Sequence, residues 1–85
     1  MVQISGVIPK DGHKLEVLLD NGNSVILDFT GRLRTLRFGL LADEDFFSRA
    51  MTDGDFVRWG NKIEISVSEV FQLAQKEMIK YENIV

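Results

Sequence analysis

Few side chains in this sequence of 85 residues have types and spacings that suggest chemistry. His13 is the only histidine and cysteine is absent, so a zinc site with the usual nitrogen and sulfur ligands cannot be assembled. None of the serines lies in a nucleophile-elbow pattern, and Ser66 is better explained as a helix cap. His13 falls in a predicted turn and is expected to be exposed. We therefore expect no catalytic, cofactor-binding or metal-binding residue, and we predict that the protein is not an enzyme.

Two acidic runs have only part of the pattern of a cation site. Asp43-Glu44-Asp45 could hold a hard cation, but adjacent residues of a helix point in different directions and rarely converge on one ion. Asp53-Gly54-Asp55 has the composition of a calcium-loop fragment but lacks the spacing to a closing glutamate. We interpret the first run as the acidic start of a short helix and the second as a turn.

Five residues are candidates for a partner or ligand surface. Three of them are basic and lie in a stretch without acids, which is either a solvated surface with partly paired charges or a docking patch for an acidic partner or a phosphate. The only tryptophan could stack on a ligand, or it could be a core residue, as a lone Trp beside strand residues often is. The fifth candidate, Ile79, lies on the polar side of the last predicted helix. The candidates are Arg32, Arg34, Arg37, Trp59 and Ile79.

Length and charge limit the class of protein. Eighty-five residues allow one domain, which we place at residues 1–82, with 83–85 as a frayed tail. The net charge is −3, and nucleic-acid binding needs clustered cations, so nucleic acid is not an expected partner. The N-terminus lacks the pattern of a signal peptide, and no apolar run approaches the ~20 residues of a membrane span. A cytoplasmic protein without a membrane partner is expected.

The first third of the sequence predicts a β meander. Residues 2–8 alternate, with Val2, Ile4 and Ile8 on one face, and residues 9–12 are turn formers. A three-residue loop at residues 20–22, with Gly22 in the left-handed conformation, gives a better register than a two-residue loop, which would mix the apolar sets. The three-residue loop places on one face Leu15, Val17, Val25 and Leu27.

The middle of the chain predicts less regular structure. Residues 30–41 are expected to form a turn or short helix and then a loop packed on the core, because Gly31 and Gly39 interrupt the pattern. Residues 43–51 predict a short helix that ends at 52–55. Its inward face is expected to hold Phe46 or Phe47, with Ala50 and Met51.

The last third predicts a hairpin and a capped helix. Residues 56–59 and 62–65 form the strands around a turn at Gly60-Asn61. Ser66 is the predicted N-cap, Glu69 completes a capping box, and Ile65 with Val70 forms a hydrophobic staple. The expected inward stripe, flanked by Leu73, consists of Val67, Val70, Phe71, Ala74, Met78 and Tyr81.

The chain resembles family 2442 of the domains of unknown function, over residues 7–71. The resemblance rests on residues 15–22, on Asp28, on residues 41–47 ahead of Phe56, and on Trp59 with residues 60–65. Gly60 stands where the family usually has proline. The resemblance implies a small, mostly bacterial α+β domain, with relatives that are the antitoxin half of two-gene toxin–antitoxin pairs and others that carry a following helix-turn-helix domain.

The expected fold is α+β: a small antiparallel sheet, made of the meander and the second hairpin, packed with a short helix and the capped C-terminal helix. Apolar residues on outer faces, Leu18 and Ile26 on the sheet and Ile79 near the end, favour a protein partner or a homodimer. Two functions follow as hypotheses. The first is a non-catalytic protein-interaction module, the antitoxin-like component of a two-gene pair that binds the neighbouring gene product. The alternative is a small-ligand-binding or sensory module that uses Trp59 and the arginine stretch.

Overall fold

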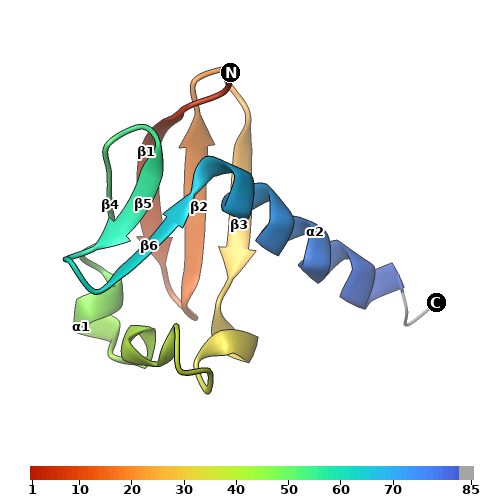
Figure 1. Cartoon of the computed structure of the whole chain (residues 1–85). Helices are drawn as coiled ribbons and strands as arrows, with labels where there is room; N and C mark the ends of the chain where they lie inside the picture. The colour runs from red at the N-terminus through yellow and green to blue at the C-terminus, as the bar shows by residue number, and fades with distance from the viewer. Residues whose placement is uncertain (83–85) are drawn as a thin grey trace.

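The computed structural model describes the backbone of residues 1–82 and the side chains of residues 1–77. Its helices and strands form a small α+β fold, as the sequence predicts (Figure 1). One antiparallel sheet has the order β1-β2-β3, and a second has the order β4-β5-β6, so the meander and the second hairpin lie in two sheets rather than in the one sheet predicted. The elements are β1 (Ile4–Lys10), β2 (Lys14–Leu19), β3 (Ser24–Asp28), the 3-10 turns η1 (Thr30–Arg32) and η2 (Gly39–Ala42), α1 (Glu44–Phe47), β4 (Met51–Thr52), β5 (Phe56–Trp59), β6 (Ile63–Ser66) and α2 (Val67–Glu82).

The register between β2 and β3 is the predicted one. Val17 pairs with Val25 and Leu15 with Leu27, and the Leu19 N–H donates to the Asn23 carbonyl at 2.9 Å. Gly22 has a φ of 89°, so the three-residue loop uses the left-handed conformation that glycine adopts without steric cost. The turn chemistry and the apolar alternation therefore agree, and the register is confirmed.

Strand β1 departs from the predicted alternation. A bulge between Ile4 and Gly6 shifts the register, so that Val7 pairs with Val17 and Ile8 with Glu16. Ile4 is buried and Val7 packs against the core, whereas Ile8 is 43% exposed. The prediction that Ile8 shares a face with Ile4 is wrong, because one extra residue in a strand reverses every side chain beyond it. The strand also continues through Lys10, so the turn begins later than predicted.

The core joins the inner faces of both sheets. Trp59 from β5 lies edge-on to Phe29, with ring centroids 5.6 Å apart, and stacks with Phe47 at 6.1 Å. Its indole N–H donates to the Phe47 carbonyl at 3.0 Å, so the buried polar atom of the ring is satisfied. Fully buried aliphatic residues surround these rings: Leu15, Val17, Leu27, Leu41, Val57, Ile65 and Val70.

Helix α1 is shorter than predicted. It spans Glu44–Phe47, and the Asp43 side chain caps it by accepting from the N–H groups of Asp45 and Phe46. Phe47 is buried, but Met51 is 70% exposed and belongs to β4, where it pairs with Arg58. The prediction of Met51 on an inward helix face is therefore wrong. Residues 51 and 52 gain backbone pairing to β5 instead, which a helical period does not reveal.

Helix α2 begins as predicted but is rotated from the predicted stripe. The Ser66 hydroxyl accepts the Glu69 N–H at 3.2 Å, as an N-cap does. Val70 and Leu73 are buried, whereas Phe71 is 44% exposed, so the assignment of Phe71 to the core is wrong. The predicted contacts of Met78 and Tyr81, and the tail at 83–85, lie outside the described residues.

We predict that Gly22→Val destabilises the protein by about 1–2 kcal/mol, because a β-branched residue is strained at the left-handed φ of 89°. Gly31→Ala is the matched control, since no positive φ and no atom within 4 Å restricts its Cβ. The control is expected to stay within about 1 kcal/mol of wild type. Urea unfolding followed by Trp59 fluorescence measures both, and equal stabilities of the two variants would contradict the turn assignment.

Candidate functional site

Arg32 joins helix α2 to the edge of β3. Its guanidinium donates to the Asp28 carbonyl at 2.8 Å, to the Glu77 carboxylate at 2.9 Å and to the Leu73 carbonyl at 3.3 Å. The other oxygen of Glu77 accepts the Asp28 N–H at 3.0 Å. The Arg32 and Glu77 side chains are only 18% and 20% exposed. The guanidinium of Arg32 therefore links β3 to helix α2 within the fold.

The bonds at Asp28 close part of a strand edge. The hydrogen bonds from the Phe29 N–H to the His13 carbonyl and from the Leu19 N–H to the Asn23 carbonyl fix the alternation of the β2–β3 ladder. Residues at even positions of β3 therefore turn their backbone groups outward. At Asp28 both outward groups are bonded, one to Glu77 and one to Arg32. Side chains thus take the place that a further strand would occupy.

Arg37 makes a second link of the same kind. It forms a two-pronged ion pair with Glu69 on α2, with Nη2 at 2.7 Å from Oε1 and Nη1 bonded to Oε2, and it donates to the Glu64 carbonyl on β6 at 2.9 Å. Its guanidinium also lies 4.9 Å from the centre of the Phe38 ring. Both oxygens of Glu69 thus bind Arg37 rather than the Ser66 N–H, which corrects the predicted capping box.

Two of the three arginines in the stretch considered as a docking patch form ion pairs within the chain. Arg32 and Arg37 are each paired with a glutamate of α2, at different points along the helix, and Arg34 is exposed. Two of the three positive charges are therefore paired with carboxylates, which agrees with the interpretation of partly paired charges, although the Arg37 side chain is 50% exposed. A docking role of this stretch for an acidic partner or a phosphate stays a prediction.

Two further residues, Trp59 and Ile79, were candidates for a partner or ligand surface. Trp59 is 0% exposed, so it is a core residue and cannot line a ligand surface in this fold. The side chain of Ile79 lies outside the described residues, and its role as a surface residue stays a prediction. Leu18 is half-buried and Ile26 is 53% exposed on the outer face of the first sheet.

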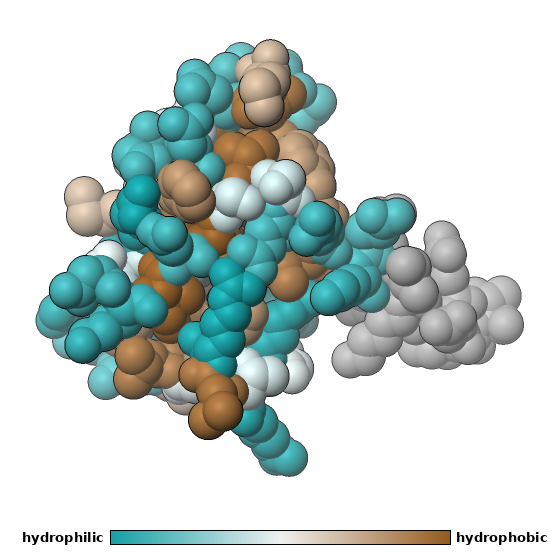
Figure 2. All heavy atoms as spheres, in the orientation of Figure 1, coloured by the Kyte–Doolittle hydropathy of each residue, from teal (hydrophilic) through white to brown (hydrophobic). Residues whose placement is uncertain are grey.

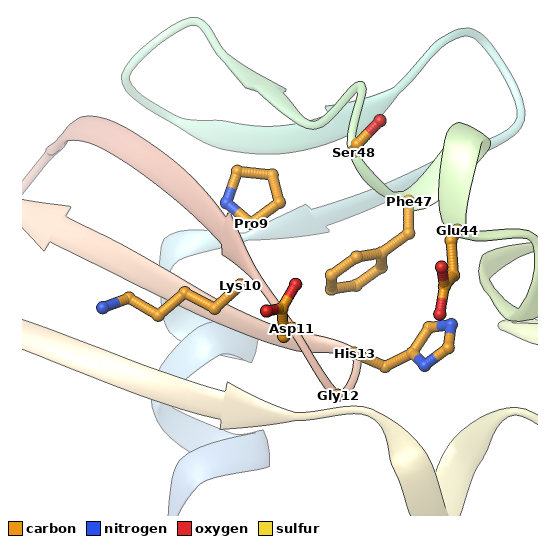
Figure 3. A pocket seen from close by; sticks show the side chains of 8 residues that line it. All are labelled: Pro9, Lys10, Asp11, Gly12, His13, Glu44, Phe47 and Ser48. Carbon is orange, nitrogen blue, oxygen red and sulfur yellow. The ribbon is translucent and has the colours of Figure 1, made fainter.

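A polar hollow of about 210 Å³ lies between the β1–β2 turn and α1 (Figure 3). His13 in this turn is half-buried rather than exposed. A ring nitrogen lies 3.3 Å from the Ala42 carbonyl, and the ring centroid is 5.4 Å from that of Phe47. Figure 3 shows the Lys10 amino group directed away from His13 and Glu44, and this amino group pairs with Glu16 instead. Within the described residues, no three histidine or acidic side chains converge to hold a metal ion.

The larger hollow is apolar and lies beside the start of α2. Its volume is about 500 Å³, and its apolar lining consists of Met1, Val2, Phe56, Val67 and Phe71. Figure 2 shows apolar surface where the N-terminus lies beside the first turns of this helix. We call this hollow the α2 groove. Sequence reasoning missed it because the helical period allowed Phe71 or Leu73 to face inward, and it assigned Phe71 to the core.

Comparisons with family models, with curated proteins and with solved structures found no match to this chain. The resemblance to family 2442 therefore stays a prediction. In residues 1–82 no helix has both the length and the apolar content that crossing a bilayer requires.

The Arg37–Glu69 pair predicts a pH-dependent stability. Hydrogen bonds from Arg37 lower the pKa of Glu69 below the ordinary value of 4.5. A carboxylate with a lowered pKa in the folded state stabilises that state above its unfolded pKa, and the contribution is lost as the pH falls through the folded value. We therefore expect Glu69→Gln to reduce stability near neutral pH and to approach wild type in stability below a pH of about 4.5.

Urea unfolding across this pH range measures the effect. Arg37→Gln is the matched variant, because it removes the other half of the pair, and it is expected to flatten the same part of the pH profile. If Glu69→Gln keeps the pH profile of wild type, the ion pair does not contribute as the structure indicates.

Proposed function

We propose that this protein is a non-catalytic protein-interaction module that binds its partner through the α2 groove. The observation that carries the proposal is Phe71, a large aromatic side chain that is 44% exposed and lines a mainly apolar hollow of about 500 Å³. Aromatic residues in such positions often contribute most of the binding energy of an interface. The adjacent apolar residues of the N-terminal segment and β5 extend the same surface.

The structure gives less support to the alternative of a ligand-binding or sensory module. That hypothesis needs Trp59 and the arginine stretch at a shared surface, whereas Trp59 is buried and Arg32 and Arg37 are paired with glutamates. The polar hollow at His13 also has its lysine directed elsewhere. The α2 groove, in contrast, uses none of these residues.

The more specific form of the proposal is an antitoxin-like component of a two-gene pair, located in the cytoplasm. The resemblance of residues 7–71 to family 2442 supports this role, and the cysteine-free sequence fits a reducing compartment. The partner is then the small protein encoded by the neighbouring gene. A homodimer through the same groove is the other partner that the sequence allows.

Co-expression of the full chain with the neighbouring gene product tests the proposal. We expect the two proteins to co-purify, and we expect Phe71→Asp to weaken their association at least about tenfold, since a charge in an apolar contact loses the burial energy of the ring. Leu36→Asp is the matched control, because Leu36 is 106% exposed and is not part of the groove lining. It is expected to leave the affinity unchanged.

Trp59 fluorescence reports whether each variant keeps its core, because the indole is buried. An equal loss of affinity in both variants, with both folded, would argue against the groove. A neighbouring protein that neither co-purifies nor is toxic when expressed alone would contradict the antitoxin-like role.

A further inference from the structure

We infer that the open part of the β3 edge accepts an extended, uncharged segment of another protein, which joins the first sheet as a fourth strand. This inference goes beyond the proposed function, because the α2 groove and this edge share no residue. Two observations carry it. The outward backbone groups of Ser24 and Ile26 bond no described residue, and the other strand edges are short or partly closed.

The β3 edge offers a row of backbone donors and acceptors. Even-numbered residues of β3 turn their N–H and C=O groups away from β2, and at Asp28 these groups bond Glu77 and Arg32. Ser24 and Ile26 are the other even positions of the strand. No residue that the structure describes bonds their outward groups. An extended peptide gains its affinity from such main-chain hydrogen bonds.

The remaining strand edges have features that hinder pairing. On β1 a bulge lies between Ile4 and Gly6, and Pro9, at an outward position of this strand, has no N–H to donate. Strand β4 has two residues, and on β6 the Glu64 carbonyl accepts from Arg37. Natural proteins protect sheet edges in these ways. The first three residues of β3 have none of these features, so this part of the edge is available to a partner.

The side chains along this edge favour an uncharged partner with a high β propensity. From Asn23 to Leu27 the sequence has no charged residue. Ile26 is 53% exposed on the outer face, and Val25 is half-buried on the inner face. β-branched and aromatic residues opposite such positions stabilise a strand pair. At the Asp28 end, side chains already take the place of a strand, so the added segment ends before this position.

Helix α2 disfavours a second copy of this chain as the occupant. The helix packs on β3 and continues past the edge of this strand (Figure 1), where Glu77 is bonded to Asp28. Antiparallel pairing of two β3 strands about a two-fold axis keeps both α2 helices on the same face of the joined sheet, and each helix extends toward the other copy. The two helices would then compete for the space above the shared strands. An extended segment of another protein brings no such helix.

Amide hydrogen exchange of the full chain, followed by NMR, tests whether the edge is open. We expect the amides of Ser24 and Ile26 to exchange at least about tenfold faster than those of Val25 and Leu27, which face β2. Exchange of an unbonded edge amide needs no opening of the ladder. Equal protection of Ile26 and Val25 in the free chain would overturn the inference, because the edge would already be covered.

Peptide selection tests the chemistry of the occupant. Linear peptides of about ten residues, long enough for one strand, are selected from a displayed random library on the immobilised full chain. We expect enriched peptides to share a run of β-branched or aromatic residues without charges. Excess of a synthetic enriched peptide is expected to slow exchange at Ser24 and Ile26 at least about tenfold. Enrichment of no peptide that protects these amides would overturn the inference.

A proline exchange tests the role of the edge backbone. Ile26→Pro removes an N–H that faces away from β2, and it is expected to weaken the labelled peptide at least about tenfold in fluorescence anisotropy. Ile26→Val is the matched control, because it keeps the N–H and a β-branched side chain, and it is expected to bind as wild type does. Ser24→Pro is a second variant of the same kind. Urea unfolding followed by Trp59 fluorescence shows which variants are folded, and unchanged binding to a folded proline variant would contradict the inference.

N-methylated peptides give a test that needs no protein variant. In a strand, alternate N–H groups point to the same neighbour. Methylation of the peptide at one set of alternate residues is therefore expected to abolish binding to the wild-type chain, and methylation at the other set is expected to leave it unchanged. Equal effects of the two sets would show that the peptide does not add as a strand.

These experiments distinguish the β3 edge from the α2 groove. Phe71→Asp is expected to leave peptide binding unchanged, and Ile26→Pro is expected to leave binding of the neighbouring gene product unchanged. If the neighbouring protein does not bind, the proposed function fails and the edge inference stands. If the peptide is lost from Phe71→Asp and retained by Ile26→Pro, the edge inference fails. A dimer in sedimentation of the free chain that Ile26→Pro abolishes would overturn it in favour of a second copy.

Discussion

The rotation of helix α2 is fixed by the burial of Val70 and Leu73 together with contacts to two arginines, and the rest of the surface depends on it. Arg37 binds Glu69, and Arg32 binds the Leu73 carbonyl and Glu77. These three helix positions are four residues apart, so they lie along one side of an α-helix. Phe71 is two residues from Glu69, about 200° around the helix. With this side of the helix bound by the arginines and with Val70 and Leu73 buried, Phe71 faces outward.

The two ion pairs also explain how the sheets end. Arg32 and Glu77 bond the outward backbone groups of Asp28 on β3, and Arg37 bonds the Glu64 carbonyl on β6. Unpaired strand edges can pair with other chains. The same residues therefore orient the helix and occupy parts of two edges beside it. Because the helix leaves its Phe71 side uncovered, the fold presents an apolar surface away from the positions that the ion pairs occupy.

Several elements of the fold could be predicted because their determinants are local. The loop at Gly22 fixed the β2–β3 register, and Ser66 fixed the start of α2, since each depends on a few neighbouring residues. The bulge in β1 and the exposure of Phe71 could not be predicted in the same way. A bulge depends on how the residues of one strand pair with those of the neighbouring strand, which the sequence of a single strand does not specify. A helix with apolar residues at both Phe71 and Leu73 has more than one possible inward face.

The candidate site likewise combines features that local sequence determines with features that depend on distant residues. The sequence by itself determined the α+β class, the absence of cysteine and the main turns and caps, because composition and local patterns specify these directly. Only the tertiary structure decided that Trp59 is buried, that Arg32 and Arg37 hold α2, and that Phe71 lines a groove. The partners of Arg32 and Arg37 are 45 and 32 residues away along the chain. Such pairings arise from how the two sheets and the helix pack, and no local pattern encodes them.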